Sequence, residues 1–169
     1  MYTTEQMHQL WQESRTRFSN QLNKITSEGI IVTAGIVRQD GGDYNTATIL
    51  AKRLGNSPNS AGFLIRHMAD VELLFSKNVF GQKDVIVSAR TVIEQHDTGE
   101  WTDWAELLDY QNYAYESLNK AILAQTDYDW GITITSKEFG RKTKAEALGR
   151  LVSHTAYHAG QLALVLKYG

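Results

Sequence analysis

Apolar residues recur every three to four positions along four long stretches of this chain, a spacing that places them on one face of a helix. The pattern predicts helices over residues 4–26, 59–78, 102–124 and 144–167. The only proline, Pro58, stands just before the second stretch, where it is compatible with a helix start. We therefore expect an all-α domain.

Local capping signals mark the ends of these helices. Asn59 or Ser60 can accept a hydrogen bond from the free amides that begin the second helix. Thr102 or Asp103 can do the same for the third helix. Gly29 follows the apolar stripe of the first helix, and a glycine in that position predicts a helix end.

The connections between these helices are longer than a minimal up-and-down bundle requires. Residues 29–42 are β-prone before a glycine turn, and residues 46–54 could form a short helix. Ahead of the last helix, Ile132 and Ile134 alternate with polar residues, which predicts a hairpin. Because no internal repeat or domain linker is evident, we expect residues 1–169 to form a single domain with small decorations in its connections.

Composition narrows the classes of function. The chain has no cysteine, so it can supply no disulfide, no thiolate ligand and no cysteine nucleophile. A formal net charge of −2 opposes nonspecific attraction to phosphate backbones, and nucleic acid is not an expected partner. The polar N-terminus and the lack of a long apolar run predict a cytoplasmic protein with no membrane partner.

Three histidines form the main candidate for chemistry. His154 and His158 are one helical turn apart in the last predicted helix, a spacing at which both rings can reach one metal ion. On a helical wheel, His67 aligns with Leu64 and Val71, so it should point into the domain. The three imidazoles could hold one ion with part of its coordination sphere open. Core histidines bonded to backbone carbonyls are the structural alternative.

The segments that carry these histidines resemble the DinB/YfiT-like superfamily of metalloenzymes. The resemblance lies in SPNSAGFLIRHMADVELLF, followed after a third helix by LGRLVSHTAYHAGQLALVLKYG. The family pattern has one histidine inside the second helix, and in the fourth helix H-x-x-x-H followed by a small residue and often Gly-Gln. The matching positions here are His67, His154, His158, Gly160 and Gln161. The similarity extends over most of the chain.

The resemblance implies an antiparallel four-helix bundle with a long crossover, and often a homodimer. It also implies that His67, His154 and His158 bind a divalent metal, commonly zinc or nickel. Ligand type does not choose between these ions, but availability in the cell favours zinc. The open position would then hold water, with its pKa lowered towards neutrality, or a small-molecule thiolate.

Characterised members of the superfamily include S-transferases and isomerases that use low-molecular-weight thiols. By this resemblance, we expect a metal-dependent thiol S-transferase that acts on a small electrophilic substrate. The alternatives are a metal-dependent hydrolase and a metal-binding or structural bundle without catalysis. In HTAYH, a threonine follows the first histidine, so the glutamate base of H-E-x-x-H proteases is missing.

Two further polar residues are secondary catalytic candidates. Asp70 lies one turn after His67, where it could orient a histidine or assist proton transfer. Gln161 lies on the flank of the last helix and could donate a hydrogen bond to a bound water or substrate. The favoured interpretation of both is an ordinary polar residue at a helix flank.

Overall fold

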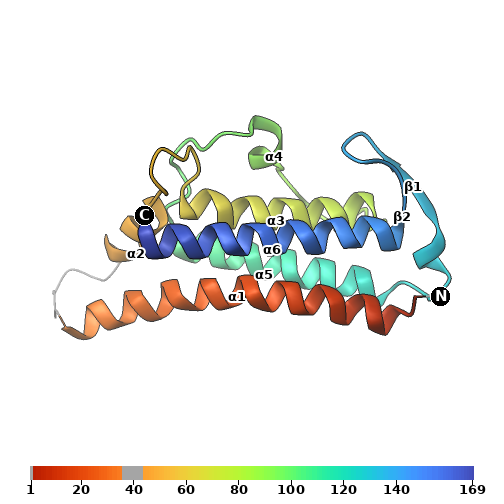
Figure 1. Cartoon of the computed structure of the whole chain (residues 1–169), viewed down its shortest axis with the longest axis horizontal. Coiled ribbons are helices and arrows are strands. Elements are labelled where there is room, and N and C mark those ends of the chain that lie inside the picture. The colour runs from red at the N-terminus through yellow and green to blue at the C-terminus, as the bar shows by residue number, and fades with distance from the viewer. Residues whose placement is uncertain (1, 36–43) are drawn as a thin grey trace.

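The computed structural model describes residues 2–35 and 44–169, with side chains described outside residues 26–45. These residues form six α-helices, one 3-10 helix and a two-stranded sheet (Figure 1). In chain order the elements are α1 (Thr4–Gly35), α2 (Tyr44–Ala51), α3 (Ala61–Asn78), α4 (Arg90–Glu94), α5 (Trp104–Leu123), η1 (Asp129–Gly131), β1 (Thr133–Ser136), β2 (Gly140–Thr143) and α6 (Lys144–Tyr168). The predicted mainly helical structure is confirmed.

Side-chain caps explain where three of the long helices begin. Ser60 accepts a hydrogen bond from the third residue of α3, and Asp103 does the same at α5. Both residues were candidates for these caps. At α6, Thr143 and Glu146 form a reciprocal capping box, which satisfies two free amides at once. Hydrogen bonds from neighbouring side chains therefore determine where these three helices begin.

The first helix differs from its prediction. α1 continues through Gly29 to Gly35, so the expected helix end at Gly29 is wrong, and so is the β structure expected over residues 29–35. Residues 36–42 of that expectation lie outside the described residues. A glycine inside a helix costs only about 1 kcal/mol, which a long helix that has already nucleated can absorb.

The predicted small elements are present in the connections. The short helix expected over residues 46–54 is α2, which begins and ends slightly earlier. The predicted hairpin is also present: β1 pairs with β2 in antiparallel register, from Thr133 opposite Thr143 to Ser136 opposite Gly140. The sequence patterns did not predict α4 or η1.

The four long helices lie along one another, with α3 between α5 and α6 and with α1 beside both of these (Figure 1). Arg66 pairs with Glu106, and one turn later Asp70 accepts a hydrogen bond from Tyr110, so α3 and α5 run in the same direction. Figure 1 shows α1 and α6 running in the opposite direction. Because α3 and α5 are parallel neighbours, the chain between them must run back along the length of α3. Residues 79–103, here called the crossover segment, make that connection.

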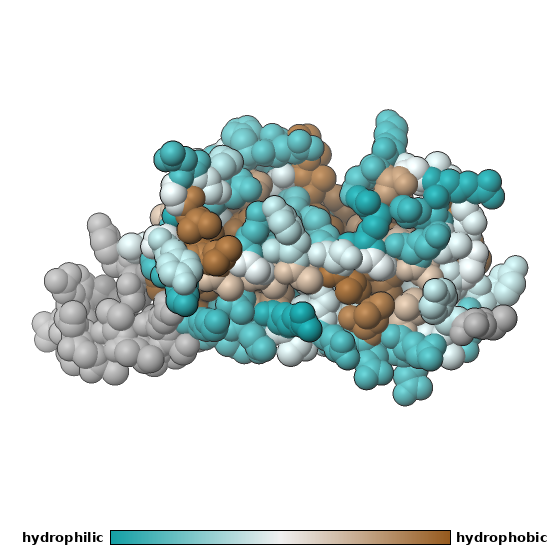
Figure 2. Space-filling view, in the orientation of Figure 1, coloured by the Kyte–Doolittle hydropathy of each residue, from teal (hydrophilic) through white to brown (hydrophobic). Residues whose placement is uncertain are grey.

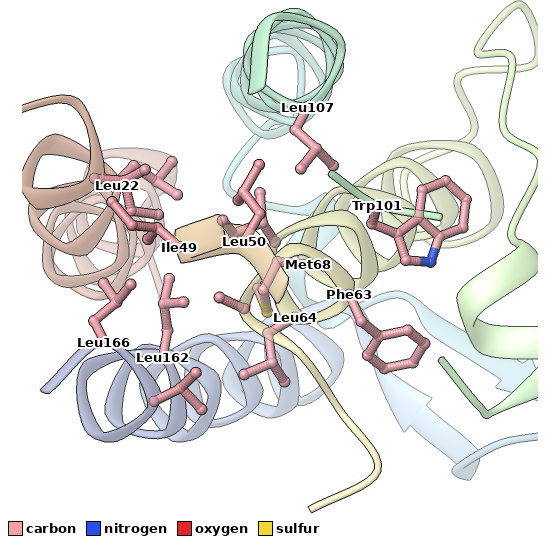
Figure 3. Close-up of a cluster of buried hydrophobic side chains, with 14 of the residues drawn as sticks. Leu22, Ile49, Leu50, Phe63, Leu64, Met68, Trp101, Leu107, Leu162 and Leu166 are labelled. Atoms are coloured by element: carbon pink, nitrogen blue, oxygen red, sulfur yellow. The ribbon is translucent and has the colours of Figure 1, made fainter. Parts of the chain in front are cut away.

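Two clusters of buried apolar side chains hold the long helices together. Figure 3 shows one of them, in which Leu22, Ile49, Leu64 and Leu162 meet from α1, α2, α3 and α6. The second cluster gathers around Trp130 at the end where the chain begins. The long helices are thus packed together at both ends. Among the described residues, no helix combines the length and the hydropathy needed to cross a bilayer.

An ion pair is buried among three of these helices. Arg15 Nε of α1 lies 3.1 Å from Glu72 Oε1 of α3, and both side chains are almost fully buried. Arg15 also donates a 2.7 Å hydrogen bond to the side chain of Gln111 in α5. Burial raises the pKa of Glu72, while the charge of Arg15 acts against that rise. Because a buried charge without its partner is costly, this pair fixes how α1 and α3 meet.

The start of α3 touches the crossover segment at a glycine. A Cβ atom on Gly62 would lie 1.8 Å from the carbonyl oxygen of Trp101, so no larger residue fits without movement of the backbone. This close approach holds the end of the crossover segment against α3, just ahead of α5.

We predict that Gly62→Ala destabilises the protein by about 2 kcal/mol or more, because the added methyl group overlaps a backbone atom. Gly149→Ala is the matched control, since Gly149 lies inside α6 with no atom near its Cβ position. The control should stabilise the protein by about 0.5–1 kcal/mol, the gain of alanine over glycine in a helix. Urea unfolding followed by circular dichroism measures both changes. Equal stability of Gly62→Ala and wild type would contradict the close approach.

Candidate metal centre

The structure brings the three predicted histidines together from two antiparallel helices. His67 comes from α3, and His154 and His158 come from successive turns of α6. His154 Nε2 lies 3.3 Å from His67 Nε2 and 3.1 Å from His158 Nε2. Candidate ligand atoms of the three rings all lie within 4.8 Å of one another. Three nitrogen atoms therefore converge on one small volume.

The distances between these nitrogen atoms suit a metal ion. A tetrahedral ion with metal–nitrogen bonds of about 2.0–2.1 Å holds its ligands about 3.3 Å apart. Hydrogen bonds between the rings explain these short distances less well. A neutral imidazole carries a single N–H, whereas His154 Nε2 lies close to Nε2 atoms of two other rings. A shared cation accounts for all three lone pairs.

Aromatic neighbours hold two of the rings in place. Phe63, one turn before His67 on α3, stacks on its ring with 8° between the planes. Tyr157 packs edge-on against His158 with the ring centroids 5.0 Å apart. Such contacts restrict ring rotation, so the orientation of these ligands is largely set before any ion binds.

The site keeps its imidazoles neutral. Burial, together with repulsion from the neighbouring His158 and His67, lowers the pKa of His154 to about 3. Burial and His67 lower the pKa of His158 to about 4. Burial also lowers the pKa of His67, although Asp70 and Glu138 act in the opposite direction. At neutral pH all three rings are in the form that binds metal.

The outward nitrogen of each ring is also buried. Nδ1 of His67, His154 and His158 has no hydrogen-bond partner within the described part of the chain. Gln161 lies against His158, where it acts against the lowering of that ring's pKa. Its Nε2 donates to Tyr157 Oη at 2.8 Å, and its Oε1 is buried and without a partner among the described residues. The second catalytic candidate thus lies beside a ligand ring.

Asp70, the other candidate, is fully buried and engaged elsewhere. Its carboxylate accepts hydrogen bonds from the backbone and the hydroxyl of Thr91 and from the hydroxyl of Tyr110, and Arg66 Nε lies 3.6 Å away. The bond to Asp70, together with burial, raises the pKa of Tyr110 to about 12. Asp70 therefore fastens α4 and α5 to α3 one turn from His67. Its effect on His67 is electrostatic, with no direct hydrogen bond to that ring.

The three rings line a cavity of about 990 Å³. Its walls come from α3 and α6, from Thr91 and Val92 of α4, and from residues 134–139 of the hairpin. Figure 2 shows the surface hollowed between the α4 region and the hairpin, with hydrophobic residues at its centre. The sequence predicted that the three histidines lie together but not these walls, because the position of a hairpin or a short helix over the site has no sequence signal.

The described residues thus define a mainly helical protein with a three-histidine, metal-type site that opens into a cavity. The sequence model of the DinB superfamily matches residues 6–162, and the chain belongs to this superfamily. No curated protein and no solved structure matched the chain. The predicted family is confirmed.

We predict that the metal-free protein loses stability as the pH falls below about 6.5. An unfolded histidine takes up a proton near that pH, whereas His154 and His158 resist protonation down to about 3 and 4 in the folded protein. Acid therefore favours the unfolded chain, and full stability is present only above about pH 6.5. Urea unfolding at a series of pH values should show that the free energy of unfolding declines less steeply with acid in His154→Leu than in wild type. An identical decline in both proteins would contradict the prediction.

Proposed function

We propose that this protein is a divalent-metal-dependent enzyme that transfers a low-molecular-weight thiol to a small electrophilic substrate. His67, His154 and His158 would hold the ion, with zinc as the first choice and nickel as the alternative. The observation that carries the proposal is the convergence of three neutral Nε2 atoms on the wall of a large cavity. Membership of the DinB superfamily supports it.

The donor set suits an ion with an open coordination position. A divalent ion held by three neutral imidazoles would supply Lewis acidity and lower the pKa of a thiol or water that reached it. The protein contributes rings that stay unprotonated, and an apolar wall that includes Phe75, Phe139 and Leu151 and limits the access of water. Because the chain has no cysteine, the thiol would come from outside.

Thiol transfer is favoured over hydrolysis by the state of the nearby carboxylates. In H-E-x-x-H hydrolases, a carboxylate acts as general base for the metal-bound water. Asp70 is already bonded to Thr91 and Tyr110, so it is not free for this role. A thiol that ionises at the metal needs no such base. Metal-dependent hydrolysis is therefore the second candidate.

The proposal also includes expectations that follow from the family resemblance. We take the four long helices as a four-helix bundle in which α3 and α5 run antiparallel to α1 and α6, joined by a long crossover. Family membership supports this architecture. We propose a homodimer in the cytoplasm from the family resemblance alone. The substrate would be a small molecule, without nucleic acid or membrane as a partner.

We predict about one divalent ion for each wild-type chain after zinc loading and removal of free metal. His158→Ala should lose most of this metal, because two imidazoles bind zinc much more weakly than three. His96→Ala is the control, since His96 is exposed and outside the three-histidine group. Elemental analysis of the three proteins, with circular dichroism to check folding, measures the result. No stoichiometric metal in wild type, or full metal in His158→Ala, would contradict the site.

We further predict that the zinc-loaded protein accelerates the reaction of small thiols with 1-chloro-2,4-dinitrobenzene. His158→Ala should lower this rate by more than roughly 100-fold, while His96→Ala should leave it unchanged. The product absorbs in the near ultraviolet, so a panel of thiols can be compared directly. Hydrolysis of ester or amide substrates without any thiol turnover would favour the hydrolase. A metal-loaded protein inactive in both assays would favour a binding role.

A further inference from the structure

An arginine and a glutamate meet on the lining of the metal-site cavity. Arg150 is on α6, one turn before His154, and Glu138 is in the turn between β1 and β2. Arg150 Nη2 lies 3.4 Å from Glu138 Oε1, and the side chains are 49% and 65% exposed. The guanidinium also lies over the ring of Phe139, 5.6 Å from its centroid. The charged end of Arg150 is therefore directed by the hairpin and remains open to solvent.

The charge of the cavity favours an anionic ligand. Of the charged side chains that the described structure places on the lining, Arg150 and Lys137 are cationic and Glu138 is anionic. The histidines are neutral, and a bound divalent ion would add positive charge. A carboxylate on a ligand would thus approach both Arg150 and the metal site favourably.

The rest of the lining suits an apolar body. Val71, Leu74 and Phe75 of α3 and Ile134 and Phe139 of the hairpin contribute apolar side chains to the same cavity. Phe75 and Phe139 lie with their ring centroids 6.1 Å apart, so an aromatic surface adjoins Arg150. A ligand with an apolar body and one terminal carboxylate matches both parts of this lining.

We propose that Arg150 is a specificity-determining residue that binds the carboxylate of a small substrate with an apolar body. Glu138 pairs with the guanidinium when no substrate is present and gives it up to the ligand. An exposed ion pair contributes little to stability, so the exchange costs little. The planar guanidinium suits a carboxylate because it can donate two parallel hydrogen bonds. This inference rests on the proposed function, because it takes the carboxylate ligand to be the electrophilic substrate of the thiol transfer.

The test compares two probes of the same shape, 4-phenylbutanoate and 4-phenylbutan-1-ol. Isothermal titration calorimetry measures the affinity of zinc-loaded wild-type protein for each probe. We expect the acid to bind roughly tenfold more tightly than the alcohol, as a hydrogen bond to a charged group allows. Arg150→Met should bring this ratio close to one. Glu138→Gln should strengthen binding of the acid several-fold, because it removes the competing carboxylate.

Two control variants separate Arg150 from other cations. Arg90 is also a partly exposed arginine paired with glutamates, but it does not line the cavity. Arg90→Met should therefore leave the ratio between the probes unchanged. Lys137 does line the cavity, so loss of the ratio in Lys137→Met but not in Arg150→Met would overturn the proposal. Circular dichroism checks that each variant is folded.

The same titrations on metal-free protein distinguish this inference from the metalloenzyme proposal. Selectivity that depends on Arg150 should persist without the ion. Selectivity that survives Arg150→Met and disappears without metal would place the carboxylate on the ion and overturn the inference. Lack of acid binding by wild type would overturn it too. In both of these cases, metal stoichiometry and thiol turnover still test the proposed function independently.

Discussion

The buried polar contacts of α3 are the constraint on which the rest of the structure depends. This helix has neighbours on several sides, and two of its buried carboxylates hold three of them. Glu72 pairs with Arg15 of α1, while Asp70 binds the start of α4 and Tyr110 of α5. Each contact is satisfied in one register only, because a slip by one residue would leave a charge buried without its partner. The position of His67 follows from this arrangement.

The metal site and the cavity are therefore produced by the same packing. α6 presents two histidines through its own helical geometry, but the third ring reaches them only if α3 is held at the correct height. The Asp70–Thr91 bond that helps to hold α3 also places α4 over the site. A change in the hydrogen bonds of Asp70 would affect the arrangement of the three histidines and the shape of the cavity together, although Asp70 makes no hydrogen bond to His67.

Sequence reasoning succeeded where the determining chemistry is local. Ser60 and Asp103 cap the helices they were expected to cap, and the histidine spacing already indicated a shared site. It failed at Gly29, because one glycine is too weak a signal to end a long helix. It also missed α4, whose flanking residues Ala89 and Gln95 adopt left-handed backbone conformations without being glycine. The cavity walls depend on where α4 and the hairpin lie in the folded protein, which the spacing of apolar residues does not predict.

The β-hairpin has a consequence for how this protein can change through evolution. Within the described part of the chain its two strands pair only with each other, and all of their residues are at least partly exposed. Substitutions of the exposed turn residues Lys137 and Glu138 can therefore change one wall of the cavity without removing a buried side chain, whereas Phe139 packs against the core. Descendants of one ancestral protein could in this way acquire cavities of different shape while they retain the same three histidines.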